Sequence, residues 1–292
     1  MKYVLVTPAR NEEDYIELTL KSVVAQEIRP VRYVVVSDGS TDQTDAIVSR
    51  YARTHTWIEL VRMPERRERH FAGKVGCFNA GYERLQGLDY DFIGSLDADI
   101  SFTPDYFSFL LGKFAADPKL GLAGTPFSEG GGTYDYRFSS TEHVSGACQL
   151  FRRKCYEDIG GYVPVKGGGI DVIAVLSSRL KGWRTQTFPE KHCVHHRPMG
   201  TATASGRIAA SFKLGRRGYC LGVHPLWHTV RSFYQMTKRP YLIGGAALLG
   251  GYWAAMLRRM ERVASPELIE FQRQEQMARL RSFGKRVLRI RA

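Results

Sequence analysis

The sequence lacks the cysteine patterns of a disulfide framework or a zinc site. Its 292 residues include five cysteines, an odd number with no C-x-x-C spacing, whereas disulfide scaffolds and zinc ribbons space theirs in short pairs. No basic, apolar and small-residue segment of the kind that directs secretion precedes Val4. We therefore expect a cytoplasmic protein whose cysteines are small core residues.

Acidic residues are scarce toward the C-terminal end of the chain. Residues 201–292 contain 17 Lys and Arg, four Glu and no Asp, and so carry the whole formal net charge of +13. Residues 1–200 hold 25 basic and 25 acidic residues. This asymmetry predicts a neutral body with a basic extension. A basic extension favours an anionic partner, which could be a membrane face, a pyrophosphate-linked substrate or nucleic acid.

One uncharged stretch, "PYLIGGAALLGGYWAAML" at residues 240–257, raises the question of a membrane. It is flanked by Lys238 and Arg239 on one side and by Arg258 and Arg259 on the other. A helix of this length would measure about 27 Å, barely the thickness of a bilayer's hydrocarbon core. A single marginal span, a helix in the membrane interface and a helix buried on the rest of the protein all remain open interpretations.

The first hundred residues alternate strand and helix signals. Apolar runs predict strands, apolar residues at helical spacing predict the helices between them, and Ser40 with Gln43 reads as a capping box for the second helix. All-apolar strands crossed by helices predict a mostly parallel sheet that is covered on both faces. The predicted strands lie at 2–8, 31–38, 57–63 and 91–99, and the predicted helices at 12–26, 40–53 and 73–85.

Carboxylates follow two of these strands where each one ends. Asp38 closes the second strand, and Asp97 and Asp99 close the fourth. Ligands of such sheets bind outside the carboxyl ends of the strands, and neighbouring carboxylates repel one another unless a cation or hydrogen-bond donors neutralise them. The pattern favours a nucleotide bound with a divalent cation. The alternative is that these acids only build turns.

Four motifs in order, "TPARNEEDYI", "VVVSDGSTDQT", "GKVGCFNAGYE" and "SLDADI", resemble the family 2 glycosyltransferases of the GT-A fold, over about residues 2–200. That fold is a Rossmann-like, mostly parallel central sheet flanked by helices. The resemblance implies that Asp99 binds Mn²⁺ or Mg²⁺ and that Asp97 meets the ribose or the sugar. The remaining implied donor-binding residues are Pro8, Arg10 and Glu12 around the nucleotide, Asp38 at the base, and Lys74 and Asn79 near the nucleotide or sugar.

Residues 144–189 resemble the family's acceptor segment, in which a Gly-rich loop delivers an acid to the start of a helix. Asp171 is that acid, and the resemblance makes it the catalytic base. Free N–H groups keep a carboxylate ionised at a helix N-terminus, so it can accept a proton from an attacking hydroxyl. The alternative is a plain N-cap. Two positions depart from the family pattern: Ile170 and Ser37 stand where relatives often carry an acid.

Three histidines occur within "EKHCVHHRPMG": His192, His195 and His196. In the GT-A group a histidine at this place completes the metal shell or touches the diphosphate. Strand alternation sends His195 and His196 to opposite faces, so we expect one at most to reach the site, and we rank His195 first. An ordinary structural histidine is the alternative. Arg197 could equally hold phosphate.

The resemblance implies transfer of a sugar, with inversion, from a nucleotide-diphosphate donor to a saccharide or lipid-linked glycan acceptor in cell-envelope polysaccharide synthesis. UDP is the first expectation for the donor, ahead of GDP and dTDP, and a polyprenyl-diphosphate carrier is one expected form of acceptor. The alternatives are a polyprenyl-phosphate sugar synthase, a sugar-phosphate nucleotidyltransferase and a nucleic-acid-binding protein. No Gly-rich, Arg-containing phosphate loop follows the first strand, which argues against the nucleotidyltransferase. The aromatic residues of the basic extension lie apart from its arginines, so we expect no nucleic-acid partner.

The expected domains are a GT-A catalytic domain at 1–204 and a basic helical extension at 205–292. The first comprises a nucleotide-sugar half at 1–115 and an acceptor half at 116–204. The second contains the membrane-associating candidate 240–257, followed by a basic amphipathic helix that starts at Ser265 and Pro266. We expect the protein to lie peripherally at the anionic inner face of the cytoplasmic membrane.

Overall fold

The computed structural model describes residues 1–65, 71–129, 132–133, 140–197 and 206–290. The chain divides into two compact units, Met1–Pro198 and Met199–Ala292. The boundary that the sequence predicts, between residues 204 and 205, lies outside the described residues.

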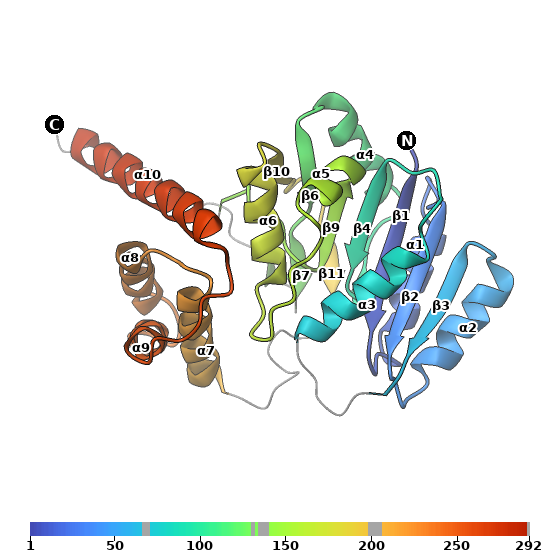
Figure 1. Ribbon diagram of the computed structural model, residues 1–292, viewed down its shortest axis with the longest axis horizontal. Coiled ribbons are helices and arrows are strands. Elements are labelled where there is room, and N and C mark those ends of the chain that lie inside the picture. The colour runs from blue at the N-terminus through green and yellow to red at the C-terminus, as the bar shows by residue number, and fades with distance from the viewer. Residues whose placement is uncertain (66–70, 130–131, 134–139, 198–205, 291–292) are drawn as a thin grey trace. The chain divides into compact units, whose positions relative to one another are not determined.

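The first unit is built on a seven-stranded sheet that is mostly parallel, as expected (Figure 1). The exception is β9, which pairs antiparallel with both β4 and β6. The other four strand pairs are parallel. In sheet order the strands are β10 (Arg184–Thr187), β6 (Leu120–Gly124), β9 (Cys148–Arg152), β4 (Phe92–Leu96), β1 (Tyr3–Ala9), β2 (Arg32–Asp38) and β3 (Ile58–Met63).

Helices cover both faces of this sheet because its central strands are apolar on both sides. One face of β1 and β2 includes Tyr3 and Tyr33, which belong to the main core together with residues of α1, α2 and α4. The opposite face carries Val6 and Val36 against α3, where a Cβ at Gly81 would lie 2.5 Å from Val6 Cγ1. The helices of this unit are α1 (Ile16–Val24), α2 (Thr44–Thr54), α3 (Phe71–Glu83), α4 (Tyr106–Ala116), α5 (Arg153–Asp158) and α6 (Ile170–Leu180).

A second, smaller sheet lies beside the carboxyl end of β4. Its order is β5 (Ile100–Ser101), β11 (Cys193–His195), β7 (Phe127–Glu129) and β8 (Gly132–Thr133). Strand β11 pairs antiparallel with β5, with His195 opposite Ile100. This pairing brings a segment from the end of the first unit next to the acids that follow β4.

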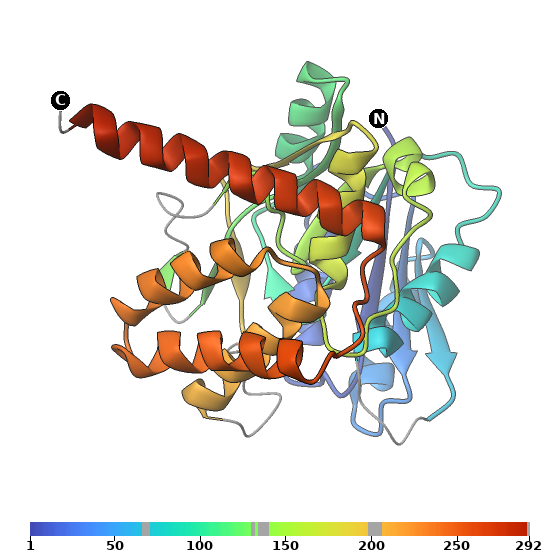
Figure 2. The same ribbon diagram turned by 60° about the vertical axis from the view of Figure 1, so that its left-hand side comes forward.

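The described residues of the second unit form four helices: α7 (Arg207–Cys220), α8 (Pro225–Met236), α9 (Ile243–Leu257) and α10 (Pro266–Ile290). Helix α9 packs against both α7 and α8, and α8 and α9 run side by side (Figure 2). Glycines permit backbone contact between α7 and α9: a Cβ at Gly251 would lie 2.1 Å from Phe212 O, and one at Gly215 would lie 2.0 Å from Leu248 O. Helix α10 begins at Pro266, as predicted, and Ser265 Oγ accepts from Leu268 N at 3.3 Å.

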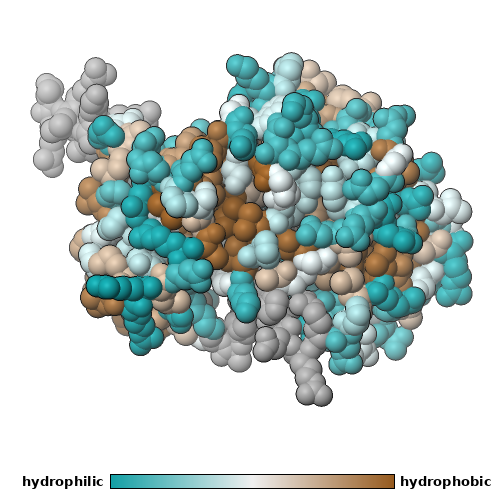
Figure 3. Space-filling view, viewed as in Figure 1, coloured by the Kyte–Doolittle hydropathy of each residue, from teal (hydrophilic) through white to brown (hydrophobic). Residues whose placement is uncertain are grey.

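The uncharged stretch 240–257 does not form one continuous helix. Helix α9 starts only at Ile243, and it buries Leu248, Tyr252 and Ala255 on one side. Among the described residues, no helix combines the length and the apolar character that crossing a membrane requires. Hydrophobic residues nevertheless reach the surface of this unit, and Figure 3 shows them among hydrophilic ones at the left of the view.

Candidate active site

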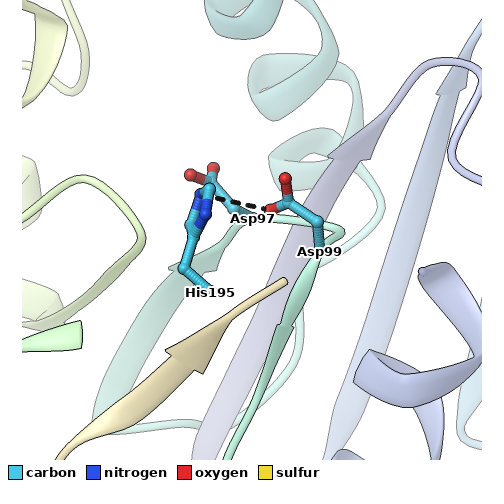
Figure 4. Close-up of side chains that lie close together, drawn as sticks. All are labelled: Asp97, Asp99 and His195. Carbon is cyan, nitrogen blue, oxygen red and sulfur yellow. Dashed lines mark ion pairs between the residues drawn. The ribbon is translucent and has the colours of Figure 1, made fainter. Parts of the chain in front are cut away.

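Two carboxylates and one imidazole meet where β4 gives way to β5. Asp97, Asp99 and His195 each offer one ligand atom, and these atoms lie within 4.8 Å of one another. Figure 4 shows the three side chains converging, with an ion pair of 3.6 Å between His195 Nε2 and Asp99 Oδ1. The structure therefore places together the three residues that the sequence singled out at these two distant positions.

The pairing of β11 with β5 explains how His195 reaches the acids. His195 stands opposite Ile100, the residue that follows Asp99, and His196 N donates to Asp99 O at 2.9 Å. The imidazole of His196 is used elsewhere, because its Nε2 lies 2.8 Å from Ser101 Oγ. Alternation along the strand thus separates the two histidines, and His195 is the one beside the acids.

The donor set of this cluster fits a divalent cation. Carboxylate oxygens are the ligands that Mg²⁺ and Mn²⁺ prefer, and an imidazole nitrogen is better suited to a transition metal than to Mg²⁺. Burial raises the pKa of Asp99, with Asp97 adding to the effect and His195 and Arg197 opposing it. Two close, partly buried carboxylates are costly to ionise together, so a bound cation would relieve their repulsion. His195 Nδ1 is itself buried without a hydrogen-bond partner among the described residues.

Lys74 interacts with Asp97 directly and with Asp171 electrostatically. Lys74 of α3 forms a short ion pair with Asp97. Burial opposes the charged form of Lys74, but Asp97, and then Asp171 and Asp99, outweigh burial and raise the pKa of Lys74. The ammonium group therefore lies within the electrostatic reach of both the acid cluster and the predicted base.

Asp171 stands in the first turn of α6. The N-cap position is held by Gly169, at a φ of 102°, so Asp171 is not a plain N-cap. Gly146 approaches its side chain closely, because a Cβ there would lie 3.1 Å from Asp171 Cβ. Its neighbour Ile170 is 8 % exposed and packs as an apolar residue. The carboxylate is thus positioned by helix geometry and by a glycine that leaves it room.

Asp38 and Arg10 meet at the carboxyl ends of β1 and β2. Arg10 Nη1 lies 3.7 Å from Asp38 Oδ2, and both side chains are mostly shielded from solvent. Pro8 belongs to β1 and pairs in register with Val36. A carboxylate beside a guanidinium offers both an acceptor and donors for the edge of a base, as the sequence predicts for this position.

Glu12 and Arg197 link this region to the cluster of Asp97, Asp99 and His195, a contact that the sequence did not predict. Arg197 Nη2 bonds to Glu12 Oε2, and Arg197 Nε lies 3.8 Å from Asp99 Oδ2. The guanidinium also lies over the ring of Tyr15, 5.4 Å from its centroid. The sequence signal for a role of Arg197 in the site was its position directly after His195 and His196.

The loops after β1 and β2 are joined by hydrogen bonds that replace the predicted capping box. Helix α2 begins at Thr44 with Gln43 at its N-cap, so the assignment of Ser40 as a cap is wrong. Ser40 Oγ instead accepts from Asn11 N at 3.2 Å. Two acidic side chains accept hydrogen bonds from the free N–H groups at the start of α2. Gln43 N donates to Glu13 Oε2 at 2.9 Å, and Thr44 N donates to Asp42 Oδ1 at 3.0 Å.

Asn79 is exposed on α3, five residues beyond Lys74. Successive helical residues are about 100° apart, so two side chains five positions apart project about 140° from each other. Lys74 and Asn79 therefore do not share a face of α3, and the structure brings only Lys74 to the acids.

Comparison with known proteins identifies a family for this chain. The family model described as glycosyl transferase family 2 matches residues 4–168. A poly-beta-1,6-N-acetyl-D-glucosamine synthase of Staphylococcus aureus is 25% identical over 203 residues, which cover 63% of this chain and 47% of that protein. The chain thus spans about half the length of the curated relatives it matches.

Two solved structures have the same fold. One is the mannosyltransferase PcManGT from Pyrobaculum calidifontis in complex with GDP-Man and Mn²⁺, with a TM-score of 0.57, 20% identity, and coverage of 98% of this chain and 80% of that one. The other is S. aureus TarS 1-349 in complex with UDP-GlcNAc, with a TM-score of 0.57, 14% identity, and coverage of 89% and 93%. At these identities the likeness concerns the fold alone.

Proposed function

The chain belongs to glycosyl transferase family 2, and from that premise we propose that it transfers a sugar, with inversion, from a nucleotide-diphosphate donor to a saccharide or lipid-linked glycan acceptor. The observation that carries the proposal is the cluster of Asp97, Asp99 and His195 at the carboxyl end of β4. That is the edge of an α/β sheet where ligands bind, and Asp38 ends the strand β2 at the same edge.

Asp99 and His195 are the proposed metal ligands, with Mn²⁺ or Mg²⁺ as the ion. When bound, such a cation neutralises the charge that develops on the departing diphosphate. The imidazole favours Mn²⁺ of the two, because Mg²⁺ prefers oxygen ligands. Asp97, held by Lys74, is left to contact the ribose or the sugar. Arg197, turned toward Asp99, adds a fixed positive charge on the same side.

Asp171 is the proposed general base. As an ionised carboxylate in the first turn of α6, it can take the proton of the attacking acceptor hydroxyl. One base is sufficient for a direct displacement at the anomeric carbon, which inverts its configuration. Ile170 cannot hydrogen-bond a sugar hydroxyl, so acceptor orientation depends on other groups.

The base of the donor is proposed to lie against Asp38 and Arg10, with Pro8 and Glu12 assigned to donor binding on the family likeness. Asn79, which lies on another face of α3 than Lys74, stays a prediction of that likeness alone. UDP is the first expectation, and GDP and dTDP are the alternatives that the experiment below separates. The solved relatives bind UDP-GlcNAc in one case and GDP-Man in another, so the fold accommodates both kinds of base.

The acceptor and the location are also proposals. Curated relatives make poly-beta-1,6-N-acetyl-D-glucosamine, which supports a glycan acceptor in cell-envelope polysaccharide synthesis. The basic charge of residues 201–292 supports contact with an anionic membrane surface. We place the protein in the cytoplasm, peripherally at the inner face of the membrane, where a polyprenyl-diphosphate-linked acceptor would be presented.

The test is a panel of nucleotides and nucleotide sugars measured by thermal shift, with and without Mn²⁺, on the wild type and on Asp99→Ala. A ligand that binds only the folded state raises the melting temperature. We expect one diphosphate nucleotide to stabilise the wild type only when Mn²⁺ is present, and to have no such effect on Asp99→Ala. Asp105→Ala is the control, because this acid pairs with Lys191 outside the cluster. Equal, metal-independent shifts in all three proteins would contradict the proposed site.

A further inference from the structure

Helix α9 presents an apolar face to solvent. Its 15 residues contain no charged side chain. While one side packs into the helical unit, the other side exposes Trp253 by 39% and Leu257 by 79%. Ala246 and Gly250 are exposed on the same side, and the spacing of these four residues, 4, 3 and 4, is that of a single helical stripe. A surface helix of a globular protein normally carries charged or polar residues on the side that faces solvent, and α9 carries none with a charge there.

Helix α7 extends this stripe sideways. Phe212 is 37% exposed, and its Cε2 lies 4.0 Å from the position of a Cβ on Gly250. Ile208, one turn earlier on α7, is 52% exposed. We define the α7–α9 face by the two residues of α7 and the four of α9: Ile208, Phe212, Ala246, Gly250, Trp253 and Leu257.

Arginines border this face. Arg258 and Arg259 follow α9 directly, Arg207 begins α7, and all three are exposed. Residues 201–292 as a whole hold 17 basic residues against four Glu. Apolar side chains that are bordered by arginine suit the boundary between lipid headgroups and acyl chains. The apolar side chains enter the acyl region there, and the arginines contact the phosphates of the headgroups.

We infer that the α7–α9 face lies on the surface of an anionic lipid bilayer and is the part of the protein that enters it. This inference rests on the membrane association proposed above and adds the surface that makes it. Helix α9 measures about 22 Å, shorter than the hydrocarbon core of about 30 Å, so it lies along the surface. Charge argues against a second copy of the chain as the occupant, since two such basic units repel each other.

The experiment is cosedimentation of the full chain with vesicles of phosphatidylcholine alone and of phosphatidylcholine with phosphatidylglycerol. We expect binding to the anionic vesicles only, and weakening of that binding by salt. The double variant Trp253→Ser/Leu257→Ser should bind at least about tenfold more weakly, since it removes two large side chains from the bilayer. Melting temperatures establish that each variant is folded.

Helix α8 supplies the matched control. Val230 and Phe233 are 43% and 58% exposed but lie outside the α7–α9 face, so Val230→Ser/Phe233→Ser should bind vesicles as the wild type does. A second variant, Arg258→Gln/Arg259→Gln at the border of the face, leaves the packed side of α9 untouched and should weaken binding to anionic vesicles.

The outcomes separate the inference from the proposals on which it rests. If the wild-type protein does not cosediment with anionic vesicles, the membrane association and the inference are both refuted, and the nucleotide test is unaffected. Wild-type binding with equal losses in the α8 and α9 variants, or with no loss in the α9 variant, would overturn the α7–α9 face alone. A dimer that dissociates in the α9 variant, with unchanged vesicle binding, would assign the face to a second copy instead.

Discussion

Asn11 joins the loop after β1 to the loop after β2: its Oδ1 accepts a hydrogen bond from Thr41 N at 2.9 Å. Its own N–H donates to Ser40 Oγ, and its backbone has a φ of 53°, in the left-handed region that asparagine tolerates better than most residues. Arg10 lies in the first of these loops, and Asp38 is the residue of β2 that directly precedes the second. The Asn11 side chain therefore helps to fix the spacing of the groups proposed to meet the base.

Replacing Asn11 should therefore weaken nucleotide binding. Asn11→Ala removes the acceptor and places an alanine at positive φ, at a cost of about 1–3 kcal/mol. Asn11→Asp retains the acceptor and should lose least, and Asn11→Gly, which keeps only the favourable backbone, should lie between. The measurements are melting temperature and nucleotide affinity by titration. Equal affinity in all three variants would exclude this positioning role.

The mostly parallel sheet could be predicted because its first strands are long runs of apolar residues. Residues 34–36 are three valines, all fully buried in β2, and they read as a strand without any partner in view. The helix between β1 and β2 has apolar residues at helical spacing, and its buried apolar residues are Ile16, Leu20 and Val23.

The small sheet could not be predicted. Strand β5 has two residues and β11 has three, too few for any periodicity, and 91 residues lie between Ser101 and Cys193. His195 could be favoured on the family likeness, but the register that places it opposite Ile100 is set by tertiary pairing. The prediction of Ser40 as a cap was wrong for a related reason. Its hydroxyl accepts hydrogen bonds from Asn11 N and from Ser37 Oγ, and only the folded structure brings Asn11 next to it.

Asp171→Asn should separate binding from transfer. The amide keeps the shape of the side chain but cannot accept the acceptor's proton, so we expect unchanged donor affinity and a loss of about 10²–10⁴-fold in turnover. Donor affinity is measured by titration, and turnover by release of the nucleoside diphosphate in the presence of acceptor. Asp45→Asn is the matched control, because Asp45 also lies in the first turn of a helix but pairs with Arg62. Full activity in Asp171→Asn would remove this residue from the mechanism.

Two adjacent glycines of α9 should respond oppositely to alanine. Gly251→Ala would push a methyl group into the backbone of α7 at Phe212 O and should destabilise the helical unit by about 1–3 kcal/mol. Gly250→Ala has room, and the higher helix propensity of alanine should stabilise α9 by up to about 1 kcal/mol. Urea unfolding followed by circular dichroism gives both values. Similar effects at the two positions would contradict the close contact of α7 and α9.

The helical unit should lose stability in mild acid because of His228. This side chain is buried on α8, its Nε2 lies 3.1 Å from Leu248 O, and its ring stacks on Tyr252 at 4.3 Å. Burial lowers the pKa of His228 below its ordinary value of 6.5, with Arg231 on the same helix acting in the same direction and the contact with Leu248 O opposing them. The unfolded chain therefore takes up the proton first.

The stability that neutral His228 provides is fully present above a pH of about 6.5 and is lost as the pH falls below it. We expect the melting temperature of the wild type to fall more steeply between about pH 7.5 and 5 than that of His228→Gln, which has no group titrating in this range. His55→Gln, in the other unit, should keep the wild-type slope and serves as the control. If His228→Gln and the wild type show parallel pH profiles, another group carries the acid sensitivity of the fold.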